Sequence, residues 1–362
     1  MKYLIRIVFL FLFLFFQQIA QASERLKVAV AGLNHDHVFL LLNLYKDKKV
    51  DIIGIAEPNE ALSNKIRTQY NLPDAIFYHD LPSLLKHVKP DAVLAYNPTD
   101  EHIRVAETCL PLKIPVMVEK PLATTLSDAK RIAFLSKQFE TPFLVNYETT
   151  WYKSNQQLKQ LVDNDEIGKI TRILVKDGHE GPKEIGCSNY FLDWLTDPKK
   201  NGGGAVMDFG CYGANLMTWL KNGERPISVT AFTQQLKPEV YPKVDDNATI
   251  ILSYRDGSTG IIQASWAWPY SVKDLQVFGT KAQLYAKNDK ELLKYKQQND
   301  PPTHVSTAIP YFENHIAYLE QVLKNAMAPE NDLGSINNNV TVVEILEAAK
   351  RSAKEGKSIL LK

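Results

Sequence analysis

Short apolar runs alternate with amphipathic stretches between residues 26 and 147 of the chain. Apolar residues recur at helical spacing over 59–70, 81–88 and 126–139. The apolar runs between these stretches are rich in Val, Ile, Leu and Ala, like the strands of a buried parallel sheet. They span 26–31, 50–56, 75–78, 91–97, 115–120 and 142–147. The alternation predicts a doubly wound α/β domain, in which ligands bind at the carboxyl ends of the strands.

The pattern changes after Tyr147. A strand-like run at 169–177 leads through a polar, glycine-bearing segment to three glycines at 202–204. Closely spaced strand-like runs then predict an antiparallel meander and hence an α+β domain with a mostly antiparallel open sheet. These runs span 227–234, 247–254, 259–266, 273–279 and 282–286. Helices are expected to close this domain at 313–327 and 340–355. The two predicted domains span 23–147 and 148–362.

The first 22 residues have the features of an export signal. Lys2 and Arg6 give a positively charged start, and an unbroken apolar run follows at 7–16. Ala20 and Ala22 then provide the small residues of a cleavage site. The apolar run is too short to span a bilayer comfortably. We therefore expect residues 1–22 to be a cleaved signal peptide. The mature protein is expected to be periplasmic or secreted, with no membrane anchor.

Composition and charge narrow the classes of partner. The chain is 45% hydrophobic and 23% charged, as in ordinary soluble globular proteins. Without Lys2 and Arg6, the 42 basic residues become 40 against 41 acidic ones, so the mature net charge of −1 gives no reason to expect nucleic acid or anionic membrane as a partner. The three cysteines are scattered and form no C-x-x-C pair, so we expect neither a disulfide framework nor a metal site.

The end of the first predicted strand carries part of a dinucleotide-binding fingerprint. Of the three glycines of G-x-G-x-x-G, only Gly32 is present, while Asn34 and His37 stand at the second and third positions. Asn tolerates left-handed backbone, and the helix beginning near His37 can direct N–H groups at a phosphate. Glu57 ends the second strand, where an acid would accept from a ribose hydroxyl and favour NAD over NADP. The alternative is a solvated loop acid before Pro58.

Two further strand ends carry polar residues. The fourth strand runs into Asn97 and Pro98, with His102 one helical turn beyond, and the fifth ends in Glu119 and Lys120. Taken alone, Lys120 is an ordinary surface charge. At the carboxyl end of an apolar strand, however, it can face a ligand and supply a cation to a buried acid.

A buried acid is expected in the stretch 202–220, which is otherwise small and apolar and predicts a helix buried on most sides. Asp208 and Tyr212 lie four residues apart and hence on one face. A carboxylate in this setting requires a partner, and Lys120 is the natural cation. The alternative is a hydrogen bond between Asp208 and Tyr212 that only fastens the helix.

With these residues, the chain resembles the Gfo/Idh/MocA oxidoreductase family, typified by glucose–fructose oxidoreductase and inositol dehydrogenase. The similarity extends over essentially the whole mature chain. It is carried by Glu119–Pro121, by Asn97–Pro98 with His102, by GGGAVMDFGCYGAN at 202–215, by DGST at 256–259 and FGT at 278–280, and by the closing helix. The resemblance implies a Rossmann domain holding NAD or NADP, a second domain whose open sheet supports a homo-oligomer, and sugar or polyol substrates.

The resemblance also implies roles for single residues. Lys120 looks like the lysine that contacts substrate, and Asp208 like the acid that orients it. Tyr212 stands where many relatives have histidine, whereas the glucose–fructose oxidoreductase and dihydrodiol dehydrogenase branches, like this chain, have tyrosine. Because a nearby ammonium favours a phenolate, Tyr212 is expected to take a proton from a sugar hydroxyl as hydride leaves the same carbon.

The remaining candidates are expected around this centre. Aromatic or imidazole side chains suited to a sugar site, each of which could equally be core packing, are Trp151, Tyr152, His179, Trp266 and Trp268. Trp151 stands where relatives often carry arginine. The residues expected to bind the dinucleotide are Gly32, Asn34, His37, Glu57, Asn97, Pro98, His102, Glu119 and Lys120.

The sequence thus predicts an exported NAD(P)-dependent oxidoreductase acting on a sugar, polyol or glycoside. An exported enzyme has no supply of fresh cofactor, which favours a redox-neutral cycle. One alternative is therefore a glycosidase that works through a transient keto sugar and a recycled cofactor. Another is a sugar-binding protein that has kept the fold and lost the cofactor.

Overall fold

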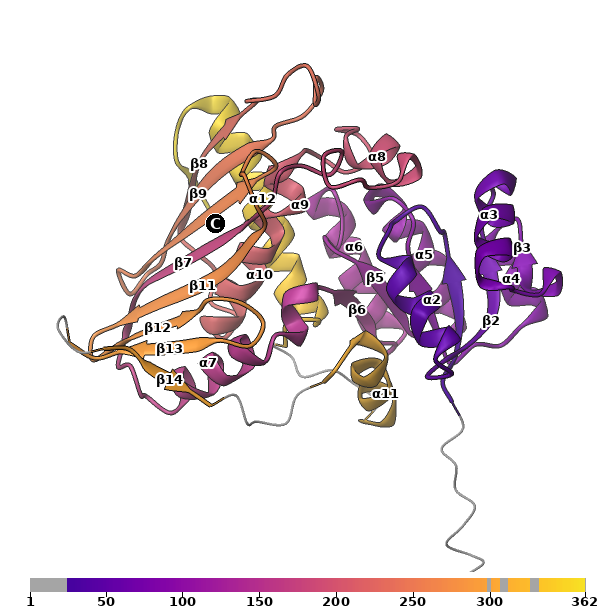
Figure 1. The fold of residues 1–362 in the computed structure, drawn as a ribbon, viewed down its shortest axis with the longest axis horizontal. Coiled ribbons are helices and arrows are strands. Elements are labelled where there is room, and N and C mark those ends of the chain that lie inside the picture. Colours follow the sequence, from indigo (N-terminus) through magenta and orange to yellow (C-terminus); the bar gives the residue numbers. More distant parts are fainter. Residues whose placement is uncertain (1–24, 298–300, 307–311, 326–331, 362) are drawn as a thin grey trace, which may run out of the picture.

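The computed structural model describes residues 25–297, 301–306, 312–325 and 332–361, and it contains two sheets with helices between them (Figure 1). The expected signal peptide at 1–22 lies outside these residues, as does the predicted helix end at 326–327. Within the described ranges, no helix combines the length and the apolar character needed to cross a membrane.

The first sheet has six parallel strands in the order β3-β2-β1-β4-β5-β6, which confirms the predicted doubly wound α/β domain. Its central strands are buried because helices cover both faces. The strands are β1 (Lys27–Ala31), β2 (Asp51–Ala56), β3 (Phe77–Tyr78), β4 (Ala92–Ala95), β5 (Val116–Glu119) and β6 (Phe143–Asn146). The helices are α2 (Val38–Lys46), α3 (Glu60–Tyr70), α4 (Leu81–His87), α5 (His102–Cys109) and α6 (Leu126–Gln138).

The second sheet has nine strands in the order β14-β13-β12-β11-β7-β10-β9-β8-β15. They are β7 (Ile170–Gly178), β8 (Ser228–Gln234), β9 (Asn247–Ser253), β10 (Thr259–Ser265), β11 (Val272–Gly279), β12 (Gln283–Ala286), β13 (Leu292–Tyr295), β14 (Thr303–Val305) and β15 (Ile359–Leu360). The sheet is mostly antiparallel, as predicted, but the expected uninterrupted meander is wrong. β7 lies between β10 and β11 and runs parallel to β10, because the long helical segment after β7 allows a parallel crossover.

In the described part of the chain, four α-helices lie between β6 and β7 or between β7 and β8, and one of them is fully buried against the sheet. α10 (Gly210–Leu220) is buried at every residue and packs on β7 and β10. The expected single helix over 202–220 is in fact two, because α9 (Ala205–Asp208) ends before Phe209. The other helices are α7 (Lys153–Asp163) and α8 (Asn189–Leu195). A side chain at Gly213 would meet Ile262 on β10, so this close approach of helix and sheet requires glycine.

The last two helices tie the second sheet to the first. Ile316, Leu319 and Val322 of α11 (His315–Asn325) join the core that contains β1 and α2. α12 (Ile336–Glu355) packs between α6 and β8, and it begins four residues earlier than predicted because Ser335 caps it. The chain thus returns to the first sheet near its end, while the boundary between 147 and 148 stays a prediction.

Candidate active site

The site is organised around an ion pair between two buried residues. Lys120 directly follows β5, and Asp208 is the last residue of α9. The Lys120 ammonium pairs with the Asp208 carboxylate and donates to the Asp208 carbonyl at 3.1 Å, and each residue is 5% exposed. Burial alone would lower the pKa of Lys120 and raise that of Asp208, but each charge shifts the pKa of the other the opposite way. Both groups therefore stay charged at neutral pH.

Trp266, just after β10, holds the other carboxylate oxygen of Asp208. Its indole Nε1–H donates to Oδ2 at 2.9 Å, and its side chain is fully buried. This bond positions Asp208, and the expected substrate contact of Trp266 stays a prediction. The alternative bond from Tyr212 to Asp208 does not form among the described residues, because Lys120 and Trp266 take the two carboxylate oxygens.

Tyr212 lies beside two ammonium groups. Its ring centroid is 5.1 Å from Lys120 Nζ and 5.0 Å from Nζ of Lys273 on β11. Burial nevertheless raises the pKa of Tyr212 well above its usual value, and Glu148 and Asp177 raise it further. The expected phenolate is therefore wrong. Asp208 already neutralises the charge of Lys120, so Tyr212 is a neutral phenol that can donate its proton.

A second charged group beside Tyr212 was missed by the sequence analysis. Lys273 pairs with Glu148 and stands directly opposite Asp177 on β7. Burial raises the pKa of Asp177 to about 8, although Lys273 opposes the shift. Only the pairing of β7 with β11 could have revealed this group, and the predicted meander placed β10 beside β11 instead.

Two expected substrate residues lie near this centre. His179 follows β7, and its ring packs on the edge of Phe209 at 4.8 Å between centroids. Its Nδ1 accepts from the Gly181 N–H at 2.9 Å, and burial lowers its pKa. The neutral ring thus carries its proton on Nε2 and can donate to a ligand. Tyr152 donates to Glu148 at 2.7 Å and lines a small cavity with Asp177 and Lys273.

The other two tryptophans make different contacts. The Trp151 indole donates to Asn146 Oδ1 at 3.2 Å, and its ring packs on that of Tyr318 of α11, with 5.4 Å between centroids. These contacts agree with the alternative that Trp151 packs on the core. Trp268 lines a hollow of about 410 Å³ on the second sheet, and none of Lys120, Asp208 and Tyr212 lines it.

The loop after β1 has the features that a dinucleotide needs. Gly32 has a φ of +78°, and a Cβ there would lie 2.7 Å from the Cβ of Asn97. Among the described residues, none accepts from the backbone N–H groups of Asn34 and Asp36, and the buried Asn34 Oδ1 has no partner. The two free N–H groups, just before α2, fit the phosphates of a dinucleotide.

Glu57 directly follows β2 and is not the solvated loop acid that was the alternative. It is buried, and its two oxygens accept from the N–H groups of Leu33 and Asn59, each at 2.8 Å. Burial raises its pKa despite these bonds. Each oxygen keeps a free lone pair, so the carboxylate holds the loop after β1 and can still accept from a ribose hydroxyl.

His102 is buried, and its two ring nitrogens differ. Its Nδ1–H donates to the Leu122 carbonyl at 3.1 Å, and burial lowers its pKa to about 4. Its Nε2 is buried and has no partner among the described residues, so the expected cofactor contact of His102 stays a prediction. Asn97 donates to Glu101 at 3.2 Å while its Oδ1, beside Gly32, has no partner in the described part of the chain, and Pro98 precedes the short helical turn Thr99–Glu101.

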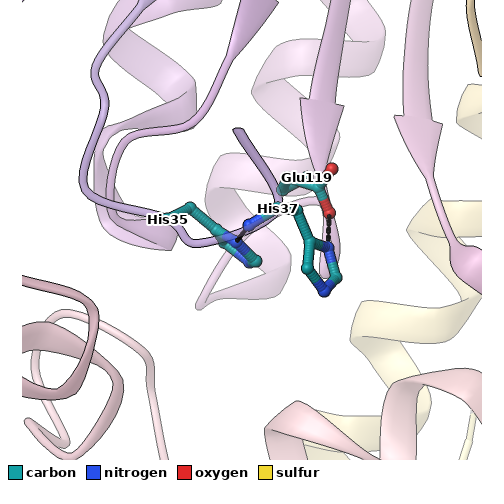
Figure 2. A group of neighbouring side chains, drawn as sticks. All are labelled: His35, His37 and Glu119. Carbon is teal, nitrogen blue, oxygen red and sulfur yellow. Dashed lines mark hydrogen bonds and ion pairs between the residues drawn. The ribbon is translucent and has the colours of Figure 1, made fainter. Parts of the chain in front are cut away.

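Glu119 and His37 meet across the first sheet, from β5 and from the loop after β1 (Figure 2). His37 Nδ1 lies 2.8 Å from Glu119 Oε2, and Asn146 donates to Oε1 at 2.7 Å. Burial disfavours the charged form of Glu119, but His37 and these bonds hold its pKa below its usual value. Both expected cofactor residues are thus brought together at the carboxyl ends of the strands.

Two family models match the chain. The model described as "Oxidoreductase family, NAD-binding Rossmann fold" covers residues 26–147, and the GFO/IDH/MocA C-terminal domain covers residues 155–285. The chain belongs to the Gfo/Idh/MocA oxidoreductase family. The domain that contains the parallel sheet is therefore an NAD-binding Rossmann domain. The protein is an NAD(P)-dependent oxidoreductase.

Named relatives support the same assignment. The trans-1,2-dihydrobenzene-1,2-diol dehydrogenase of Xenopus tropicalis is 24% identical over 240 residues, which are 66% of this Gfo/Idh/MocA chain and 67% of the relative. An inositol dehydrogenase homolog from Azotobacter vinelandii, solved with NAD⁺, has a TM-score of 0.80 at 17% identity, covering 94% of this chain and 98% of that one. The aldose–aldose oxidoreductase of Caulobacter crescentus, solved with glycerol, has a TM-score of 0.78 at 19% identity, covering 93% and 100%. The two solved structures establish the common fold.

Replacing Trp266 by phenylalanine should remove one of the hydrogen bonds that hold the Asp208 carboxylate in place. Trp266→Phe keeps an aromatic ring but leaves one oxygen of a buried carboxylate without its donor, so the free energy of unfolding is expected to fall by about 2 kcal/mol or more. Urea denaturation measures this change, and Trp268→Phe is the matched control. Equal losses in the two variants would contradict the positioning role.

Asp177 should make stability depend on pH. Its pKa of about 8 in the folded protein exceeds the value of about 3.9 for an unfolded chain. Between these values the folded protein holds a proton that the unfolded chain has released, so stability falls as pH rises through this window. The fall is at most about tenfold in the folding equilibrium constant per pH unit. Asp177→Asn should remove this slope in urea denaturation, whereas the exposed Asp193→Asn should keep it; a slope unchanged in Asp177→Asn would refute the assignment.

Proposed function

We propose that this protein is an exported oxidoreductase that moves hydride between a hydroxyl-bearing carbon of a sugar, polyol or glycoside and a nicotinamide dinucleotide. The observation that carries the proposal is the convergence of Lys120 from the Rossmann domain with Asp208 and Tyr212 from the second domain. The free N–H groups after β1 and the carboxylate of Glu57 fit the dinucleotide.

The charge state of each side chain determines its role in the reaction. The nicotinamide ring, when bound, supplies the hydride chemistry. Lys120, fixed by Asp208, can donate to the substrate oxygen and stabilise negative charge that develops on it. Tyr212 holds its proton at neutral pH and can give it to that oxygen when a carbonyl is reduced. The Lys273 ammonium, 5.0 Å from the ring, would stabilise the phenolate that this transfer leaves on Tyr212. In the direction of oxidation, the same phenolate would take the proton of the substrate hydroxyl as hydride leaves that carbon for the nicotinamide.

Donors around Tyr212 favour a substrate with several hydroxyl groups. Lys120, Lys273 and the Nε2–H of His179 all donate, which suits the oxygens of a polyol or sugar. The names of two similar proteins, a dihydrodiol dehydrogenase and an aldose–aldose oxidoreductase, agree with this class. We further propose that the protein is a homo-oligomer through the open face of the nine-stranded sheet.

A redox-neutral cycle is the second candidate, and contacts over the cofactor loop favour it. Trp194 of α8 donates to the Asn34 carbonyl at 2.9 Å, and Ser188 donates to Asp36 through its hydroxyl at 2.6 Å and its N–H at 2.7 Å. The second domain is therefore bonded directly to the loop that would hold the phosphates, which favours slow release of a bound dinucleotide. An exported enzyme that keeps its cofactor could pair the oxidation of one sugar with the reduction of another, or cleave a glycoside through a keto sugar.

Native mass spectrometry of the purified protein tests the proposal, followed by assays on a panel of sugars, polyols and glycosides. A retained dinucleotide, together with sugar conversion, is expected. Net change in nicotinamide absorbance would indicate a simple dehydrogenase, whereas glycoside cleavage or paired sugar conversion without net change would indicate the redox-neutral cycle. A sugar-binding protein that carries no dinucleotide, and binds none when it is added, would refute both.

Tyr212→Phe should separate chemistry from binding. The substitution keeps the ring between its neighbours and removes only the proton donor, so turnover is expected to fall about 10²- to 10⁴-fold. The dissociation constant for the dinucleotide, measured by calorimetry, should stay within about twofold. Tyr147→Phe is the matched control, because Tyr147 is buried with its ring 5.4 Å from that of Tyr212. Equal turnover in the two variants would remove Tyr212 from the mechanism.

A further inference from the structure

Two histidines and a glutamate converge at the carboxyl ends of β1 and β5. His35 and His37 come from the loop after β1, and Glu119 is the last residue of β5 (Figure 2). One nitrogen from each imidazole and one carboxylate oxygen lie within 4.8 Å of one another. His35 and Glu119 are buried, whereas the His37 side chain is 31% exposed, so one side of the cluster is open.

We propose that His35, His37 and Glu119 bind a divalent transition metal, Zn²⁺ or a cation of similar character. Two imidazoles and one carboxylate are a ligand set that such cations take, and three protein ligands leave at least one coordination position open. The proposal goes beyond the hydride transfer proposed above and does not depend on it, because no step of that chemistry uses these imidazoles.

The distances within the cluster suit a shared ion. His37 Nδ1 lies 2.8 Å from Glu119 Oε2, close to the separation of about 3 Å between neighbouring ligand atoms on bonds of about 2.1 Å. A metal would take the place of the proton between these two atoms. His35 Nδ1 accepts from the His37 N–H at 3.2 Å, which leaves Nε2 as the ring nitrogen of His35 without this bond.

The surroundings hold the three side chains in place. Asn146 donates to the second oxygen of Glu119 at 2.7 Å, and Trp151 donates to Asn146 at 3.2 Å. The His35 ring packs against Phe191 at 4.5 Å and Trp194 at 5.5 Å between centroids. Hydrogen-bonded and packed neighbours of this kind orient metal ligands in general.

The nearest cation is already balanced and does not compete for the carboxylate. Lys120 follows Glu119 in the chain, but its ammonium pairs with Asp208. Glu119 is the one carboxylate of the cluster. A divalent cation would therefore find a carboxylate that has no lysine or arginine partner within the described part of the chain.

Metal titration of the untagged full chain, stripped with a chelator and dialysed, tests the site. We expect one Zn²⁺ per chain by calorimetry, and visible absorption bands on addition of Co²⁺ from a site with nitrogen and oxygen ligands. Asn146→Ala should weaken Zn²⁺ binding about 10-fold, and Glu119→Gln should weaken it by more than about 100-fold. The exposed His304→Ala is the matched control and should bind as the unchanged protein does.

Absence of binding to the unchanged protein would overturn the proposal, as would Zn²⁺ affinity that is the same in Glu119→Gln. Circular dichroism checks that each variant is folded. If Glu119→Gln does not fold, His37→Ala decides the question, because the part-exposed His37 side chain can be truncated with less effect on packing. Unchanged Co²⁺ bands in His37→Ala would mean that the cluster is only a hydrogen-bonded support for the loop after β1.

Discussion

The pairing of Lys120 with Asp208 is the constraint on which the rest of the site depends. Two buried charges are costly to bring out of water, and removing one leaves the other uncompensated, so both ends must be placed accurately. The first sheet places Lys120 at the end of β5. Asp245 places Asp208: its carboxylate accepts from the N–H groups of Gly204 and Val206 at 2.9 and 2.7 Å, and so fixes the start of α9. The glycine at 204 is required because a side chain would collide with the Asp245 carbonyl.

Because the charges of Lys120 and Asp208 balance, the pair fixes the geometry around Tyr212 but adds no net charge that would shift the pKa of Tyr212. Burial is the largest influence on the pKa of that phenol and raises it, and Glu148 and Asp177 raise it further. Lys273 pairs with Glu148 and keeps a cation beside the ring. The site is therefore arranged around a proton held on Tyr212 at neutral pH, with the Lys273 ammonium next to the ring that would lose it. This arrangement differs from a phenolate formed in advance by Lys120.

The sequence was informative wherever a property is local. Apolar runs located the strands of the first sheet, and the need of a buried Asp208 for a cation pointed to Lys120. Properties that depend on sheet order were not accessible, since the spacing of β10 and β11 is the same whether or not β7 lies between them. That order decides which residues face Tyr212, so Lys273 and Asp177 were missed. The break at Phe209 was also missed, because the segments 205–207 and 210–220 are both small and apolar and show no change of pattern. The expectation of no metal site considered cysteine spacing alone, whereas the cluster joins a His-x-His pair to a glutamate 82 residues beyond His37.

Glu119 and Lys120 show how one dipeptide can organise two sites. Adjacent residues at a strand end direct their side chains to opposite sides, so the carboxylate and the ammonium of this pair do not neutralise each other. Each must find its partner elsewhere. Glu119 finds His37 and Asn146 within the Rossmann domain, while Lys120 finds Asp208 in the second domain. If the two residues exchanged places, the composition would be unchanged. The glutamate would then face Asp208, a group of its own sign, and the lysine would face His37 and Asn146, where it has no carboxylate partner. The dipeptide thus ties the loop after β1 to the ion pair, although the two sites share no direct bond.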